Sequence, residues 1–231
     1  PKVYKLWQNG ESVGIFQFES QGMTNFMKEL KPDCLEDIIA GVSLYRPGPM
    51  DQIPRYIANK KDPEHAVYTH PALKPILEVT YGCMVYQEQV MQIVRDLAGY
   101  SLGRADLVRR AMGKKKLDVM AKEREIFIHG QTDENGNIVV PGCIRNGIDE
   151  QSANKIFDEM AEFAKYAFNK SHAAAYAVVS YRTAYLKAYY PTEFMAAMLN
   201  SFLGNLDKVP GYIEECKRLS IQRLKPDINK S

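Results

Sequence analysis

The chain has 231 residues, 45% of them hydrophobic and 25% charged, and its 30 Lys and Arg nearly balance 28 Asp and Glu, which leaves a net charge of +2. This length and apolar content predict a soluble, folded protein with a substantial core, in one large domain or two small ones. Because no apolar run approaches the ~20 residues that span a bilayer and the first residues lack the apolar segment of a signal peptide, we expect a cytoplasmic protein without membrane contact.

The N-terminal part alternates short elements with turns. Residues 13–18 are typical of a short strand, and Ser20 is suited to cap a helix that runs to about residue 30. A second helix begins after Asp33 and ends at Arg46-Pro47-Gly48-Pro49, which cannot continue it. Further elements follow in chain order: helices near 51–59 and 71–79, an extended piece at 82–86, and a helix with a stripe of Val90, Ile93, Val94 and Leu97.

The C-terminal part is predicted to be helical, with one insertion. Asn135-Gly136 between β-branched residues predicts a small hairpin around 131–141. In the tail, an amphipathic helix precedes Lys225-Pro226-Asp227, which is typical of a chain leaving a domain. The other predicted helices cover 103–112, 116–129, 149–165, 171–190 and 192–202. The sequence thus predicts a mainly α, multi-helix fold with a short strand or hairpin near the N-terminus and a small hairpin insert.

The cysteines carry no sign of metal or disulfide chemistry. They lie far apart, no two form a Cys-x-x-Cys pair, and no histidine has the spacing of a companion ligand. We expect each to be a small buried hydrophobe in a reducing compartment. The four are Cys34, Cys83, Cys143 and Cys216.

Positive charge is concentrated in a run at 109–116 that contains no acid. The arginines end a predicted helix, Gly113 lets the chain turn, and the lysines open the next helix, so backbone N–H and ammonium groups can converge on phosphate oxygens. A solvated basic loop is the alternative. The five cations are Arg109, Arg110, Lys114, Lys115 and Lys116.

A second acid-free segment extends from Phe163 to Thr192 and carries four cations. Together, 109–117 and 163–192 hold nine Lys and Arg, which leaves 21 basic against 28 acidic residues elsewhere. This division predicts one anion-binding face on an otherwise acidic body. The four cations are Lys165, Lys170, Arg182 and Lys187.

Within that segment, Asn169 to His172 place an amide, an ammonium, a hydroxyl and an imidazole between two predicted helices. Ser171 could simply cap the second helix, and His172 could be a hydrogen-bonded residue of its first turn. Lys170 favours an anionic ligand, because a positive charge beside a helix N-terminus is unfavourable unless an anion is shared.

Two further features have a structural and a functional interpretation. Tyr181, Tyr185 and Tyr189 lie on one face of a predicted helix. Such a stripe usually packs against a neighbouring helix, and the functional alternative is that the rings stack on nucleobases. Arg46 either caps carbonyls at the end of the preceding helix or is held toward a ligand by the rigid Pro-Gly-Pro turn.

The chain shows no catalytic motif of its own: Gly-x-Ser-x-Gly, the Walker loop and His-Glu-x-x-His are all absent. Phosphoryl transfer with two metals needs several carboxylates that converge on the metal ions. The two acid-free segments contain no carboxylate and cannot provide them. If the cationic face serves phosphoryl transfer, it clamps phosphate while the metal-binding acids come from elsewhere.

Five motifs in order resemble the fingers region of the alpha subunit of bacterial DNA polymerase III, the C-family of replicative polymerases. The resemblance covers about residues 13–201 and implies residues 1–204 as a fingers domain, with 205–231 as the linker and first helix of the following region, in a fragment of a longer polypeptide. The motifs are Gly-Ile-Phe-Gln-Phe-Glu-Ser at 14–20, Leu-Tyr-Arg-Pro-Gly-Pro at 44–49, Tyr-Gln-Glu-Gln-Val-Met at 86–91, the basic run at 109–116, and Phe-Asn-Lys-Ser-His-Ala-Ala-Ala-Tyr at 168–176.

The resemblance implies DNA-templated addition of deoxynucleoside triphosphates to a primer end. It places the basic run at the triphosphate and neighbouring DNA, with Arg46, Tyr166, Asn169, Lys170, Ser171 and His172 also in the nucleotide and DNA site. A bulky His172 or Tyr166 near the sugar would exclude a 2′-hydroxyl. The family's magnesium-binding aspartates lie in a palm domain with no matching motif here, so the resemblance implies no metal or cofactor in this fragment and no catalysis alone. Implied partners are template-primer DNA, the palm and thumb domains, the sliding clamp and other replisome subunits.

Two other hypotheses remain open on sequence. Composition alone equally supports a stand-alone helical module that binds nucleic acid without polymerase activity, and such a module would bind duplex DNA tightly with a steep salt dependence. A scaffold that binds proteins through its acidic body would show no dependence on nucleic acid.

Overall fold

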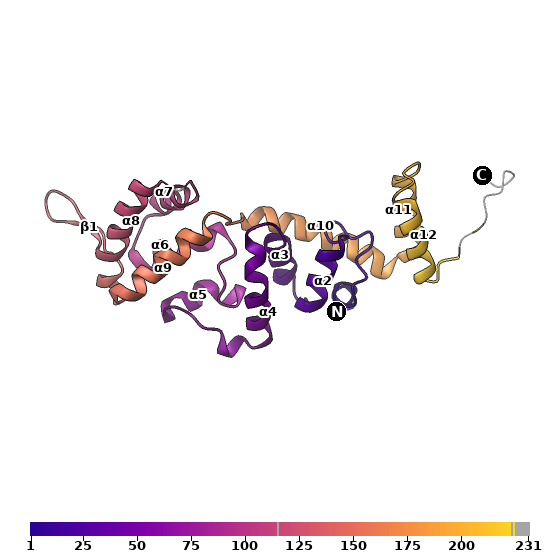
Figure 1. The fold of residues 1–231 in the computed structure, drawn as a ribbon, viewed down its shortest axis with the longest axis horizontal. Coiled ribbons are helices and arrows are strands. Elements are labelled where there is room, and N and C mark those ends of the chain that lie inside the picture. Colours follow the sequence, from indigo (N-terminus) through magenta and orange to yellow (C-terminus); the bar gives the residue numbers. More distant parts are fainter. Residues whose placement is uncertain (115, 223, 225–231) are drawn as a thin grey trace. The chain divides into compact units, whose positions relative to one another are not determined.

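The structure is a computed structural model that describes residues 1–114, 116–222 and 224, and helices make up most of it (Figure 1). It divides into two compact units: unit 1 combines Pro1–Ile38 with the described residues from Ala174 onward, and unit 2 is Ile39–Ala173. The predicted mainly α fold with a small hairpin is confirmed. No helix among the described residues combines the length and apolar character needed to span a membrane.

Unit 1 is built on two helix pairs, in which α1 (Lys2–Asn9) packs on α2 (Gln21–Leu30) and α11 (Pro191–Ser201) packs on α12 (Val209–Arg218). Ser20 caps α2 as predicted, because its hydroxyl accepts the Met23 N–H at 3.3 Å. The chain passes into unit 2 within α3 (Leu35–Leu44) and returns within α10 (Lys170–Tyr189).

The predicted strand over 13–18 is wrong. The Ile15 and Phe18 N–H groups donate to the Ser12 and Ile15 carbonyls at 3.0 Å each, so the segment consists of tight turns. Gly14 and Gln17 have φ angles of 80° and 68°, a left-handed conformation that an extended strand does not contain. The apolar residues of the pattern are nevertheless core residues, since Ile15 and Phe18 are fully buried.

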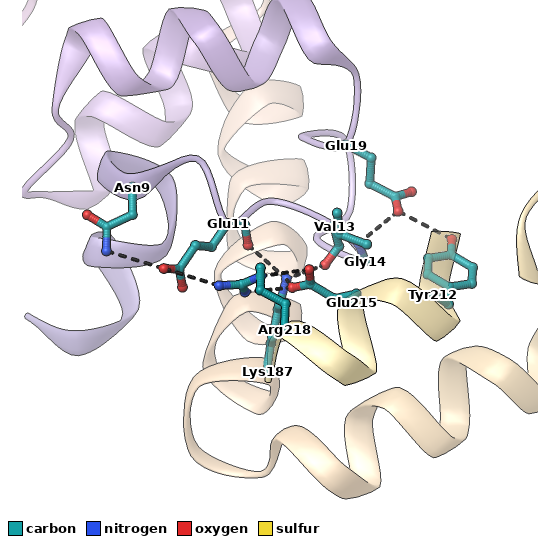
Figure 2. Close-up of polar contacts among 9 residues, drawn as sticks. All are labelled: Asn9, Glu11, Val13, Gly14, Glu19, Lys187, Tyr212, Glu215 and Arg218. Atoms are coloured by element: carbon teal, nitrogen blue, oxygen red, sulfur yellow. Dashed lines mark hydrogen bonds and ion pairs between the residues drawn. The ribbon is translucent and has the colours of Figure 1, made fainter. Parts of the chain in front are cut away.

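A buried ammonium group holds unit 1 together (Figure 2). The Lys187 side chain on α10 is fully buried; its Nζ donates to the Glu11 carbonyl at 2.8 Å and the Val13 carbonyl at 2.6 Å, and it pairs with the Glu215 carboxylate at 2.6 Å. Arg218 pairs with the same carboxylate at 2.7 Å. The prediction that Lys187 contributes to an anion-binding face is therefore wrong, because its charge is used inside the fold.

The charges of this pair are set by opposing effects. Burial lowers the pKa of Lys187, while the hydrogen bond and charge of Glu215 oppose that shift. Burial raises the pKa of Glu215, but hydrogen bonds from Arg218 and Lys187 outweigh it and hold that pKa below its ordinary value. The ionised pair satisfies Glu215 and both carbonyl oxygens at once.

Unit 2 is a helical cluster whose core lies among α6, α7, α8 and α9. The predicted apolar stripe of α6 is confirmed, since Val90, Ile93, Val94 and Leu97 are all buried. The helix predicted near 71–79 is instead three short helical segments. With η for a 3-10 helix, the bounds are η1 (Pro49–Gln52), α4 (Ile53–Lys61), η2 (Pro63–His65), η3 (Pro71–Leu73), α5 (Lys74–Leu77), η4 (Glu78–Thr80), α6 (Gln87–Ala98), α7 (Leu102–Gly113), α8 (Leu117–His129), η5 (Ile144–Asn146) and α9 (Glu150–Phe163).

The predicted hairpin insert is confirmed. β1 (Gln131–Thr132) pairs antiparallel with β2 (Ile138–Val140), with Gln131 opposite Val140 and Thr132 opposite Ile138. The Asp133 carboxylate closes the turn by accepting the backbone N–H groups of Asn135 at 2.9 Å and Asn137 at 2.8 Å.

The domain boundary predicted after residue 204 stays a prediction. It falls in unit 1, between α11 and α12, whose side chains share one apolar cluster. Lys225-Pro226-Asp227, the predicted exit from the domain, lies outside the described residues.

Replacing Lys187 by Met tests the buried pair. The substitution leaves Glu215 and two backbone carbonyls short of a donor, and breaking a buried ion pair in this way costs about 3 kcal/mol of unfolding free energy. The matched control is Lys217→Met on α12, whose side chain is 54% exposed and whose loss should cost less than about 0.5 kcal/mol. Equal unfolding free energies for the two variants, measured in urea, would contradict the analysis.

Acid sensitivity provides a second measurement of the same pair. Because the pKa of Glu215 in the fold lies below its unfolded value of about 4.3, the stabilisation is fully present above that pH and is lost as the pH falls further. Lys187→Met removes one cause of the lowered pKa, so the variant should lose less stability than the wild type between about pH 6 and pH 3. Thermal unfolding at pH 6 and pH 3 measures the stability that the wild type and the variant each lose. Equal losses for the two proteins would contradict the prediction.

Candidate functional site

Unit 2 joins two motif segments that are far apart in sequence, the turn at 86–89 and the segment at 166–172. Tyr86 forms a parallel β-bridge with Phe168, and the Gln87 N–H donates to the Phe168 carbonyl at 2.8 Å. The Gln87 side-chain amide also donates to the Ala167 carbonyl at 3.0 Å. The start of α6 therefore fixes the backbone that leads into α10.

The Glu88 carboxylate lies at the N-terminus of α10. It accepts the Lys170 backbone N–H at 3.1 and 3.2 Å and the Asn169 side-chain amide at 2.9 Å. A carboxylate is favourable there, because the unpaired N–H groups of a helix start carry partial positive charge. The anion that the sequence predicted beside Lys170 is, in the described structure, this carboxylate from α6.

Asn169 caps α10. Its side-chain oxygen accepts the His172 N–H at 2.9 Å and the Ser171 hydroxyl. The prediction that Ser171 caps this helix is therefore wrong, since α10 begins at Lys170 and the cap lies one residue earlier. The two rings at this helix start are in contact, with the His172 ring edge-on to Phe168 at a centroid distance of 5.4 Å.

Arg46 fastens the same segment from the other side. Its Nε donates to the Ser43 carbonyl at 3.1 Å, one of its terminal nitrogens donates to the Tyr166 carbonyl, and its guanidinium lies 4.4 Å from the centroid of the Phe168 ring. Burial lowers the pKa of Arg46. The carbonyl-capping interpretation of Arg46 thus describes its contacts, and the contact with Tyr166 places it in the candidate site.

The turn after Arg46 requires a glycine. Gly48 has a φ of 100°, and a Cβ at this position would collide with the ring of Tyr166. Only a residue without a side chain lets the aromatic ring approach the turn this closely. Tyr166 is thus placed by its ring on Gly48 and by its carbonyl under Arg46.

In the basic run, two arginines share one acid. Arg109 donates to the Asp106 carboxylate at 2.6 and 3.1 Å, and Arg110 pairs with its second oxygen at 2.7 Å. These hydrogen bonds and charges, those of Arg109 first, hold the pKa of Asp106 below its ordinary value. Lys114 and Lys116 are exposed, and Lys115 lies outside the described residues.

The basic run passes close to the end of α9, just before the segment at 166–172. A Cβ on Gly113 would lie 3.4 Å from the Ala164 carbonyl oxygen, and the buried Met112 belongs to the same apolar cluster as Phe163. Gly113, in the middle of the basic run, thus lies near Ala164, which follows α9 and precedes Tyr166 by two residues. Convergence of the charged groups on one ligand remains a prediction.

The tyrosine stripe of α10 belongs to unit 1. Tyr181 packs against another helix, whereas Tyr185 and Tyr189 are 42% and 46% exposed, so stacking on nucleobases stays a prediction for these two. Tyr181 lies against Tyr4 with ring centroids 5.6 Å apart, and Tyr185 lies against Tyr189 at 4.6 Å. The acid-free segment at 163–192 is divided between the two units, and its predicted contribution to one anion-binding face stays a prediction.

Sequence reasoning missed the residues that hold the site in place. Gln87 and Glu88 lie in the motif at 86–91, but nothing in the sequence shows which distant segment they contact, so it predicts no role for them. Asp106 had a usable signal, since it precedes Arg109 and Arg110 by three and four residues, the spacing at which helix side chains meet.

Comparison with known proteins agrees with this arrangement of motifs. Residues 1–135 match the family described as "Bacterial DNA polymerase III alpha subunit finger domain", and the chain belongs to that family. Two relatives, each named "DNA polymerase III subunit alpha", are 51% identical over the whole chain: one from Xylella fastidiosa (strain 9a5c) and one from Thermus aquaticus. A third of that name, from Borreliella burgdorferi, is 49% identical. The chain spans 18% or 19% of the length of these relatives.

A Gly48→Ala variant tests the aromatic contact in the turn. The added methyl group should displace Tyr166 and strain a left-handed backbone, at a cost of about 1–3 kcal/mol in unfolding free energy. Gly103→Ala is the control, because this helical glycine has open space around it and the change should stabilise α7 by about 0.5–1 kcal/mol. The expectation fails if Gly48→Ala is as stable as the wild type.

Truncating Glu88 tests the helix-start contact. Glu88→Ala should remove the acceptor for the Lys170 N–H, lower stability by about 1–2 kcal/mol, and speed hydrogen exchange at the Lys170 and Ser171 amides. Glu134→Ala, an exposed change in the hairpin turn, should leave those amides unchanged. Unaltered exchange at residues 170 and 171 in the Glu88 variant would refute the role.

Proposed function

We propose that this chain is the fingers portion of a bacterial replicative DNA polymerase and that unit 2 binds the incoming deoxynucleoside triphosphate and the adjoining template-primer backbone. The observation that carries the proposal is the approach of Gly113, at the end of α7, to the Ala164 carbonyl just after α9, two residues before Tyr166. Membership of the fingers family supports the ligand class.

The arginine pair is suited to a triphosphate. Guanidinium groups bind phosphate through paired hydrogen bonds, and the Asp106 carboxylate holds both groups near one point. In the proposal Arg109 and Arg110 contact the triphosphate, and Lys114, Lys115 and Lys116 contact neighbouring phosphates of the nucleotide or the DNA.

The segment at 166–172 is suited to the sugar side of the nucleotide. Asn169, Lys170, Ser171 and His172 contact phosphate or sugar in the proposal, and the bulk of His172 or Tyr166 excludes a 2′-hydroxyl. Support comes from the rigid placement of this segment by Glu88, Gln87 and Arg46, since discrimination of one hydroxyl requires fixed walls.

The metal-binding carboxylates are proposed to lie outside this chain. In the part of the chain that the structure describes, Asp33, Cys34 and Asp37 are close enough to share an ion. Their thiol does not suit magnesium, which prefers oxygen ligands only, and the Asp37 carboxylate already accepts the Asp33 N–H at 3.0 Å. We therefore assign no metal-dependent step to these residues and propose that the isolated chain is inactive.

The proposal extends to the compartment and partners of the complete polypeptide, which we infer from its family. The complete polypeptide would work in the cytoplasm with palm and thumb domains, a sliding clamp and other replisome subunits, and would bind magnesium through palm carboxylates. Activity would be reconstituted only with the remaining four fifths of the polypeptide that the relatives contain.

Charge reversal in the complete polymerase tests the phosphate contacts. Arg110→Glu should lower kcat/KM for nucleotide addition at least tenfold, because a charge-assisted contact to phosphate is lost and a repulsive charge is introduced. The matched control is Arg145→Glu, an exposed arginine in η5, which should change kcat/KM by less than about twofold. Similar kinetics for the two variants would overturn the proposal.

The rival hypothesis is separated by DNA binding of the isolated chain. A stand-alone nucleic-acid-binding module would bind duplex DNA tightly and lose affinity steeply with salt. A fingers portion without palm and thumb should bind weakly at physiological salt. Tight, salt-dependent binding that Arg110→Glu does not weaken would favour the rival.

A further inference from the structure

A cavity of about 220 Å³ opens in unit 2 between η1, α4, the η4 turn and the last turn of α9. Its rim carries the exposed side chains of Asp51, Arg55 and Glu162, and Glu159 adds a half-buried carboxylate. Three carboxylates and one guanidinium therefore line the same cavity. The Arg55 guanidinium also donates to the Val67 and Gly82 carbonyls at 3.4 and 3.5 Å, so part of its hydrogen-bonding capacity is used on the α4 side.

The floor of this cavity is apolar. Leu77, Met84 and Pro49 are buried beneath the acidic rim, and Phe163 and Tyr166 add aromatic rings to the wall. An apolar floor under a charged rim is the arrangement of a site that fixes a ligand's polar end and buries its body.

The helix that supplies two of the carboxylates strengthens the case for a cation. Glu162 lies in the last turn of α9, which contains no basic residue, and Glu159 immediately precedes that turn. The carbonyl groups at the C-terminus of a helix carry partial negative charge, so acids in that turn are intrinsically unfavourable and a cation is favoured. Thr69 donates its hydroxyl to Glu159 at 2.7 Å but adds no positive charge.

We infer that this cavity binds a small organic cation, an ammonium or amidinium group on a compact apolar body. The cationic end lies at the rim among Asp51, Glu159 and Glu162, and the body lies on Leu77 and Met84. This site goes beyond the proposed nucleotide function, because the contacts assigned to phosphate involve none of these carboxylates. It adjoins that function at Tyr166, whose ring borders the cavity and packs on Gly48.

Benzamidine is a suitable probe, because it joins an amidinium to one aromatic ring. Titrated into the 231-residue chain labelled at methyl groups, it should shift the Met84 and Leu77 methyl resonances in a saturable way, with a dissociation constant of about 1 mM. Benzamide has nearly the same shape without the charge, and benzoate reverses the charge. Both should bind at least tenfold more weakly.

Two rim variants locate the cationic end. Glu162→Gln and Asp51→Asn should each weaken benzamidine binding about threefold, and the double variant about tenfold, as expected for partly exposed ion pairs. Both side chains are exposed, so the fold should persist, and unchanged methyl spectra without ligand verify this. Glu134→Gln, the same charge change in the hairpin turn, should leave the affinity unchanged.

The benzamidine titrations show whether the cavity is a binding site for an organic cation. Saturable shifts at Met84 and Leu77 that weaken in the rim variants support it. Shifts that do not saturate by about 20 mM, equal binding of benzamide, or an affinity indifferent to both rim substitutions each overturn it. Because the readout is a binding shift in the isolated chain, loss of the nucleotide proposal would leave this result standing.

Discussion

The placement of the Glu88 carboxylate at the start of α10 is the contact on which the candidate site depends. It satisfies the first N–H of the helix and an Asn169 amide with one acid from another element. The neighbouring Gln87 contacts hold the preceding backbone, and Arg46 and Gly48 hold Tyr166. The segment at 166–172 is thus held by Gln87, Glu88 and Gly48, which have no proposed contact with ligand, and by Arg46, which is itself assigned to the site. Positioning of this kind is what selectivity for one sugar or phosphate geometry requires.

The two compact units use charge in opposite ways. In unit 1, Lys187 on α10 forms a buried ion pair with Glu215 on α12. It also donates to the Glu11 carbonyl in the connection that follows α1, so it links three parts of the unit. In unit 2, Arg110, Lys114 and Lys116 of the basic run are exposed, and Asp106 partly neutralises the charges of Arg109 and Arg110. A sum over the sequence cannot separate these uses, because it counts a buried ammonium and an exposed one alike.

Local sequence signals predicted most helices, caps and turns, but the contacts between segments that are distant in the sequence could not be predicted. The Ser20 cap, the apolar stripe of α6 and the Asn135-Gly136 turn each depend on residues within a few positions, so the sequence contains their cause. Residues 13–18 failed because burial of Ile15 and Phe18 is satisfied by turns as well as by a strand. Ser171 failed as a cap because Asn169, two positions earlier, provides a competing acceptor. The pairing of 86–89 with 166–172 had no local signal at all.

Asp106 gives the basic run a property that its cations alone would not have. Because this carboxylate already engages both Arg109 and Arg110, an arriving anion takes over partners instead of meeting bare charge. The free energy gained is then the difference between two anionic partners, so a single carboxylate gains little and a dense, multiply charged phosphate chain gains most. Under the proposed function, this exchange would act as a threshold that disfavours single carboxylates at the arginine pair and favours polyphosphates.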